Sequence, residues 1–185
     1  MRYFIISLPK SGTYLAANLY QELGIDFSYI HYNVGGYTKY DPNNFEDSKK
    51  NPVKYTNKGP LIETIDLLGE NQVAVGHIKH EPRFVELFKP LNKVLMTRRR
   101  LDIDASAKRW KEYSGRNVSS VLSTIPAILE WRDEPDVFVL NFNDINNCNV
   151  ERIDELQKHL FGEVKVDSEL AVERALSKDS MTKVP

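Results

Sequence analysis

The sequence contains one cysteine, Cys148, among 185 residues. A single cysteine cannot form a disulfide bond within the chain or a metal site built from several thiolates, so we expect a reducing compartment. The sequence also contains no apolar run of the ~18 residues that a membrane-spanning helix requires, and we expect no signal-type leader before the first strand. These properties predict a cytoplasmic protein with no membrane partner.

Neither sign of charge is in excess. The formal net charge is −1, with 25 lysines and arginines against 26 acidic residues, so no global field attracts nucleic acid. Any anion-binding site must therefore be local. Because 41% of the residues are hydrophobic, we expect one globular domain over residues 1–185 with a substantial core.

Short apolar segments alternate along the chain with segments of helical periodicity. The expected strands are residues 3–7, 25–32, 72–76, 93–97 and 136–142. The expected helices are residues 13–23, 61–68, 82–88, 101–113, 118–131, 150–160 and 171–176. This alternation predicts an α/β fold of three layers, with a central parallel sheet covered by helices on both faces.

Residues 37–60 are polar and rich in proline and asparagine, and we expect them to form a long loop. The loop carries aromatic side chains at Tyr37, Tyr40, Phe45 and Tyr55. Two interpretations stay open for them: they wall a substrate pocket, or they belong to an ordinary surface loop.

The stretch Tyr3–Gly24 predicts a strand, a tight loop and a helix. The first N–H groups of a helix have no internal partner, and the helix dipole favours an anion there. Gly12 allows the backbone to approach a ligand, and Lys10 adds a full positive charge. Ser11 and Thr13 add hydroxyl donors. The loop lacks the Walker A pattern G-x-x-x-x-G-K-[ST], and an ordinary turn of this composition is the alternative.

A second anion site is expected at Arg98, where the strand 93–97 ends. Arg98 precedes Asp102 by four residues and Ser106 by eight, so a guanidinium and a hydroxyl are available to hold a phosphate. Asp102 is better placed to cap the helix or to pair with an arginine. The alternative is a solvated basic turn, and three consecutive arginines in a neutral chain make only a weak nucleic-acid patch.

His77 follows the strand 72–76, so three strands end in polar residues at one edge of the sheet. In open parallel sheets, ligands bind beyond the carboxyl ends of the strands. An imidazole with a pKa near ~6.5 is suited to act as a general base, although a structural histidine is the common alternative. His31, His80 and His159 have no such support from their positions.

Together these motifs resemble those of the sulfotransferases that use 3′-phosphoadenosine 5′-phosphosulfate (PAPS). The family's first motif reads P-K-S-G-T-T-W, and its second reads R-x-P-x-D-x-x-x-S. The matching residues are Pro9, Lys10, Ser11, Gly12 and Thr13 for the first motif and Arg98, Asp102 and Ser106 for the second. His77 is similar in position to the family's catalytic histidine in T-H-L-P.

The chain also departs from the family pattern. Tyr14 replaces the second threonine of the first motif, and Leu15 replaces the tryptophan that packs on the adenine. The family's C-terminal R-K-G loop, which helps to hold the 3′-phosphate, has no counterpart before Pro185.

The resemblance implies a sulfotransferase fold related to that of the P-loop NTPases. It implies transfer of a sulfuryl group from PAPS to a hydroxyl or amine of a small-molecule acceptor by in-line displacement, leaving 3′,5′-adenosine bisphosphate (PAP). The implied roles are general base for His77, stabilisation of charge by Lys10, cofactor binding by residues 9–14 including Tyr14, and a grip on the 3′-phosphate by Arg98 and Ser106. No metal is required. A nucleotide kinase of related fold and a non-catalytic nucleotide-binding module are the alternatives.

Overall fold

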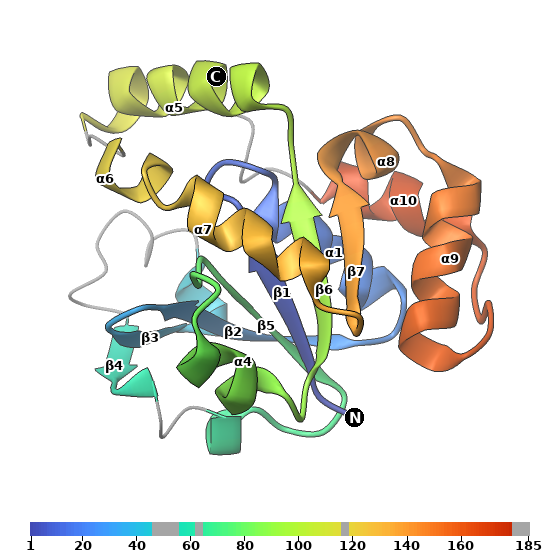
Figure 1. Cartoon of the computed structure of the whole chain (residues 1–185). Coiled ribbons are helices and arrows are strands. Elements are labelled where there is room, and N and C mark those ends of the chain that lie inside the picture. Colours follow the sequence, from blue (N-terminus) through green and yellow to red (C-terminus); the bar gives the residue numbers. More distant parts are fainter. Residues whose placement is uncertain (46–55, 62–64, 116–118, 179–185) are drawn as a thin grey trace.

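The computed structural model describes residues 1–45, 56–61, 65–115 and 119–178. Within these residues a seven-stranded sheet has the order β4-β3-β2-β5-β1-β6-β7 (Figure 1). The strands are β1 (Tyr3–Ser7), β2 (Asp26–Asn33), β3 (Gly36–Tyr40), β4 (Thr56–Gly59), β5 (Gln72–Gly76), β6 (Asn92–Thr97) and β7 (Val137–Asn141). The pairings β2–β5, β5–β1, β1–β6 and β6–β7 are parallel, whereas β3 and β4 add an antiparallel edge.

Helices cover both faces of this sheet, which makes three layers (Figure 1). The α-helices are α1 (Thr13–Glu22), α4 (Pro82–Phe88), α5 (Arg100–Ser114), α6 (Ser119–Leu122), α7 (Ile125–Leu129), α8 (Phe142–Asn146), α9 (Val150–Phe161) and α10 (Ser168–Ser177). Short 3-10 helices occur at Pro42–Asn44, Ile65–Leu67 and Glu130–Asp133. The expected α/β class with a central parallel sheet is confirmed.

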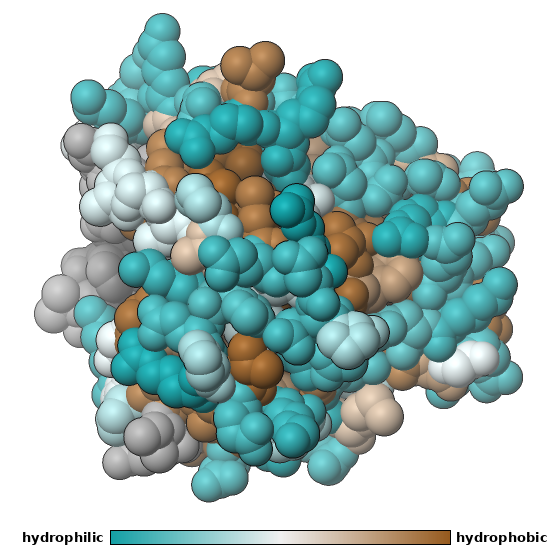
Figure 2. All heavy atoms as spheres, viewed as in Figure 1, coloured by the Kyte–Doolittle hydropathy of each residue, from teal (hydrophilic) through white to brown (hydrophobic). Residues whose placement is uncertain are grey.

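The core consists of one hydrophobic cluster on each side of the sheet. Because side chains alternate along a strand, Tyr3 and Ile5 of β1 pack towards α1, α8, α9 and α10. Phe4 and Ile6 pack towards α4, α7 and the 3-10 helix Glu130–Asp133. All four side chains are buried, which holds the central strand rigidly and fixes the position of the loop that follows it. On the outside, the face seen in Figure 2 is covered mainly by hydrophilic residues.

The prediction of a long loop over residues 37–60 is wrong for the residues that the structure describes, because β3 and β4 lie in this range. β2 turns into β3 at Gly35, whose N–H donates to the Asn33 side chain over 3.0 Å, and the hairpin brings Gly36 opposite Asn33. Tyr55 lies outside the described residues, as do residues 62–64 of the expected helix 61–68.

The prediction of one continuous helix over residues 118–131 is also wrong. α6 ends at Leu122, α7 begins at Ile125, and Pro126 stands in its first turn, where a proline has no N–H to continue a helix from the preceding turn. The sequence patterns missed α8, which begins with a reciprocal capping box between Asn141 and Asp144.

Candidate functional site

The loop between β1 and α1 has a backbone that few residues adopt. Lys10 has a φ of 65° and Gly12 a φ of 91°, both in the left-handed region. The first α-helical hydrogen bond runs from the Ala16 N–H to the Gly12 carbonyl at 3.0 Å. The N–H groups at the start of α1 therefore have no helical acceptor and are directed out of the helix mouth.

Arg98 lies at this same helix mouth. Its Nη1 donates to the Lys10 carbonyl over 3.1 Å, and its guanidinium carbon stands 4.0 Å from the centre of the Phe142 ring. A Cβ atom on Gly12 would come within 2.6 Å of that same ring, so only glycine fits there. The two anion sites expected from the sequence are thus packed on one another through Phe142.

Two features leave Arg98 ready for a ligand. Its Nε is buried and has no hydrogen-bond partner among the described residues. Phe142 contacts the guanidinium face, and the nearby Asp102, which favours the charged form of Arg98, forms its ion pair with Arg99 instead. A buried donor without an acceptor costs free energy that an anion would recover.

Lys10 lies beside other cations. Its Nζ is 4.3 Å from the centre of the Trp110 ring, and no carboxylate of the described residues forms an ion pair with it. Burial, together with the positive charges of Arg109 and Arg98, lowers the pKa of the Lys10 ammonium to about 8. Lys10 is still mainly protonated at pH 7.

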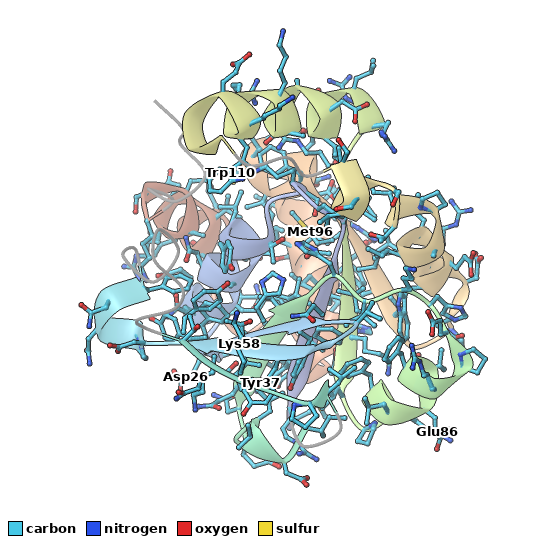
Figure 3. All side chains as sticks on the ribbon, turned by 90° about the vertical axis from the view of Figure 1, so that its left-hand side faces the viewer. Asp26, Tyr37, Lys58, Glu86, Met96 and Trp110 are labelled. Carbon is cyan, nitrogen blue, oxygen red and sulfur yellow. The ribbon has the colours of Figure 1, made fainter. Side chains whose placement is uncertain are left out.

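Arg109 and Trp110 of α5 were not expected from the sequence. Figure 3 shows Trp110 on the side of α5 that faces the rest of the molecule. Neither residue belongs to a motif, and their positions depend on how α5 crosses the carboxyl ends of the strands, which no local pattern encodes.

The loop hydroxyls are engaged inside the fold. Ser11 Oγ donates to the Leu8 carbonyl at 2.7 Å and lies 3.2 Å from the Met96 carbonyl. Thr13 Oγ1 is 2.9 Å from Ser7 Oγ. These hydroxyls hold the loop against β6 and β1, so the backbone N–H groups and Lys10 are the groups left to meet an anion.

His77 lies just beyond β5, next to the end of β1. Its Nδ1 is 2.8 Å from the Ser7 carbonyl oxygen, which can only accept, so Nδ1 carries the proton and Nε2 is the basic nitrogen. Burial lowers the pKa of His77, the bond to Ser7 opposes this, and the charge of Lys10 lowers the pKa again. A neutral imidazole with a defined tautomer is suited to accept a proton.

A second imidazole is adjacent. The rings of His31 and His77 are 4.9 Å apart at 72°, and His31 Nδ1 lies 3.2 Å from the Tyr14 hydroxyl. Tyr14 also packs edge-on against Phe45, which contacts Tyr40. Aromatic side chains therefore extend from the neighbourhood of His77 along one face of the sheet.

Tyr37 does not join this group. It packs with the opposite hydrophobic cluster, because residues 37 and 40 of β3 are an odd number of positions apart and point to opposite faces.

The other basic residues near Arg98 are compensated on the surface. Arg99 pairs with Asp102 at 2.8 Å, and Arg100 pairs with Asp104 at 3.0 Å. Asp102 is thus the arginine partner that its position suggested. Ser106 is half-buried on α5, one turn before Trp110 and on the same face.

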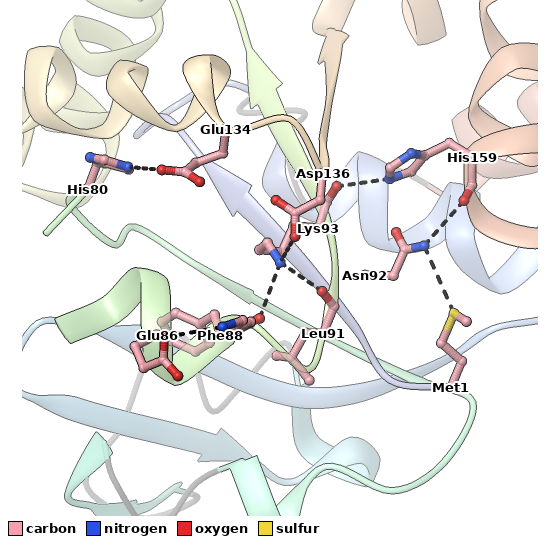
Figure 4. Close-up of polar contacts among 11 residues, drawn as sticks. Met1, His80, Glu86, Phe88, Leu91, Asn92, Lys93, Glu134, Asp136 and His159 are labelled. Carbon is pink, nitrogen blue, oxygen red and sulfur yellow. Dashed lines mark hydrogen bonds and ion pairs between the residues drawn. The ribbon is translucent and has the colours of Figure 1, made fainter. Parts of the chain in front are cut away.

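The remaining histidines lie elsewhere. His80 Nε2 is 2.7 Å from Glu134, and His159 Nε2 is 3.2 Å from the Lys93 carbonyl (Figure 4). No group of three or more potential metal ligands occurs among the described residues, and none of their helices has the length and apolarity needed to span a membrane.

The geometry defines an α/β protein in which Lys10, Arg98 and His77 lie together at the carboxyl ends of the parallel strands. Sequence comparison gives no match to a family model or to a curated protein.

Comparison with solved structures does give matches. Retinol dehydratase in complex with androsterone and the inactive cofactor PAP aligns with a TM-score of 0.56 at 12% identity, covering 95% of this chain and 63% of that one. Mouse sulfotransferase SULT7A1 complexed with PAP has a TM-score of 0.56 at 16% identity, covering 94% and 63%. Retinol dehydratase with retinol and PAP has a TM-score of 0.59 at 14% identity, covering 95% and 63%.

The chain therefore has the fold of the PAPS-dependent sulfotransferases, and the resemblance inferred from the motifs is confirmed at the level of the fold. It spans about 63% of the length of these matched proteins.

Proposed function

We propose that this protein is a sulfotransferase that transfers a sulfuryl group from PAPS to a hydroxyl or amine of a small-molecule acceptor. One observation carries the proposal. The cations of Lys10 and Arg98 lie together at the mouth of α1 beside the imidazole of His77, and Lys10 has no carboxylate partner among the described residues. All three matched structures contain PAP, and one of the proteins is a sulfotransferase by name, which supports the same assignment.

The residues present fit an anionic nucleotide. Arg98 has a buried Nε that lacks a hydrogen-bond partner among the described residues, and Lys10 has no carboxylate partner there. Arg98, with Ser106 on the helix α5 that follows it, would hold the 3′-phosphate, and residues Pro9 to Tyr14 would bind the phosphosulfate end. When bound, PAPS supplies a sulfuryl group already activated by its bond to a phosphate.

The chain's own groups then have three tasks. Lys10 and the N–H groups of Gly12 and Thr13 stabilise negative charge on the transferring group and on the departing phosphate. His77 Nε2 takes the proton of the acceptor as its oxygen or nitrogen attacks. Ser7 keeps the imidazole oriented through the bond from Nδ1 to its carbonyl.

The test is a titration of the intact protein with PAP and with ATP in the presence and absence of magnesium, followed by transfer from PAPS to a panel of alcohols, phenols and amines. We expect tight PAP binding and sulfation of at least one acceptor. Preference for ATP with magnesium indicates a nucleotide kinase instead. PAP binding without sulfation across the panel indicates a non-catalytic binding module.

A further inference from the structure

The contact between Lys10 and Trp110 joins two parts of the chain that are far apart in sequence. Lys10 belongs to the β1–α1 loop, and Trp110 to α5, which runs across the carboxyl ends of the strands (Figure 1). The ammonium nitrogen lies 4.3 Å from the centre of the indole ring. This distance is well within the range in which a cation is attracted to the negative face of an aromatic ring.

Charged groups near Lys10 give this contact its importance. Arg98 from the end of β6 and Arg109 from α5 both repel the ammonium, and the ammonium in turn affects His77 beyond β5. No carboxylate of the described part of the chain pairs with Lys10. The indole therefore attracts the Lys10 ammonium while the neighbouring guanidinium groups repel it.

An aromatic partner differs from a carboxylate in what it leaves available. A carboxylate would cancel the charge and compete with an incoming anion. A ring covers one side of the ammonium, keeps the full charge, and leaves N–H donors on the other side. It also limits the rotamers of a flexible lysine, so less entropy is lost when an anion binds.

We propose that Trp110 is the positioning residue for Lys10, holding its ammonium charged and oriented towards the mouth of α1 before the nucleotide arrives. The inference rests on the anion-binding role given to Lys10 under the proposed function and deepens it. It assigns to α5 a part of the site that none of the sequence motifs contains. Ser106, to which the proposed function assigns the 3′-phosphate, lies one turn before Trp110 on the same helical face.

The experiment compares Trp110→Phe with Trp110→Leu, which leave side chains of similar size but differ in the presence of a ring. The pKa of Lys10 is measured in the nucleotide-free protein from the NMR shift of its ε-carbon. We expect the pKa in Trp110→Leu to fall below that in Trp110→Phe, because only the ring stabilises the charged form. Equal pKa values in the two variants would overturn the proposal.

The same variants are then titrated with PAP at pH 7. We expect Trp110→Leu to bind about 3- to 30-fold more weakly than the wild type, with Trp110→Phe between them. In a Lys10→Met background the two variants should bind alike. A difference that persists without the ammonium would show that Trp110 acts through packing alone.

A matched control is available at a distance from the site. Lys165 lies 4.7 Å from the centre of the Phe161 ring near the end of α9. Phe161→Leu removes that contact and should leave PAP affinity unchanged. Trp110→Tyr provides a second ring-bearing variant if Trp110→Phe folds poorly. Because the Lys10 titration needs no nucleotide, a protein that fails to bind PAP refutes the proposed function but leaves this inference testable.

Discussion

Two lysines lie at opposite ends of the neighbouring strands β6 and β1, in opposite electrostatic surroundings. Lys93, near the start of β6, has a side chain that is 2% exposed, and its ammonium contacts Asp136 at 2.6 Å and the carbonyls of Leu91 and Phe88 at 3.0 and 3.4 Å (Figure 4). Lys10, beyond the end of β1, contacts an aromatic ring and is close to two arginines. One charge is satisfied within the fold and the other is not.

This contrast distinguishes a cation that stabilises the fold from one that is a candidate for ligand binding. A buried charge is tolerated when its donors are all paired, as for Lys93. Holding Lys10 close to Arg98 and Arg109 without an acidic partner is unfavourable for the empty protein. A bound anion would make the charge of Lys10 favourable for the folded protein. We therefore expect the ligand at the carboxyl ends of the strands, where Lys10 lies.

The largest effect is expected from removing the uncompensated charge. Lys10→Ala should abolish measurable sulfuryl transfer, because the ammonium stabilises charge on the transferring group. The free energy of unfolding should stay within about 0.5 kcal/mol of the wild type or rise, since a repelled cation is lost. Transfer assays and urea denaturation measure the two quantities.

Lys93→Met is the matched control for that experiment. It should lower the free energy of unfolding by about 1–3 kcal/mol, because two buried carbonyls lose their donor, and leave PAP affinity unchanged. If Lys10→Ala keeps its activity, or if Lys93→Met loses PAP binding, the separation of the two lysines is wrong.

A smaller effect is expected at the imidazole beside Lys10. His77→Ala should lower turnover by about 10²- to 10⁴-fold with little loss of PAP affinity, because the general base acts on the acceptor and not on the nucleotide. His80→Ala, whose histidine pairs with Glu134 elsewhere, should retain the turnover of the wild type. An equal loss of PAP binding in His77→Ala would make His77 a structural residue.

Much of the fold follows from local patterns. The buried strands β1, β5 and β6 are short apolar runs, and α1 and α9 each end at a left-handed glycine next to the last turn. The edge hairpin β3–β4 was missed because half-exposed strands of mixed polarity resemble a loop.

Only part of the candidate site could be predicted from the sequence, because local patterns locate the ends of strands but not the path of a helix across the sheet. Lys10, His77 and Arg98 could be predicted from the sequence because each lies within three residues of the end of a strand, and parallel strands bring their carboxyl ends together. Trp110 and Arg109 stand in the middle of α5, where the pattern shows only a polar helix. Their proximity to Lys10 depends on the path of that helix across the sheet, which is a tertiary property.

The dependence of binding on pH should follow the ammonium of Lys10. Because its pKa is lowered to about 8, raising the pH from 7 to 9 neutralises it, and PAP affinity should fall by about tenfold. Calorimetry at pH 8 in buffers of different ionisation enthalpy should detect the uptake of about half a proton on binding. Trp110→Leu should move the fall in affinity to lower pH, and Lys10→Met should remove it.

The last expected effect is on the stability of the nucleotide-free protein in alkali. The folded-state pKa of Lys10 is about 8, whereas an unfolded lysine titrates near ~10.4, so the unfolded chain binds more protons between these values. Lys10 therefore makes the free energy of unfolding rise as pH increases through this window, the reverse of the behaviour of a lysine held by a carboxylate. Urea denaturation at several pH values, for the wild type and for Lys10→Met, isolates this contribution from other groups.

Between pH 8 and 10, the free energy of unfolding of the wild type should rise relative to that of Lys10→Met. Saturating PAP should reverse this trend, because the anion stabilises the charged form of Lys10. A wild type that loses stability relative to Lys10→Met over this range without nucleotide would mean that Lys10 has an anionic partner in the empty protein.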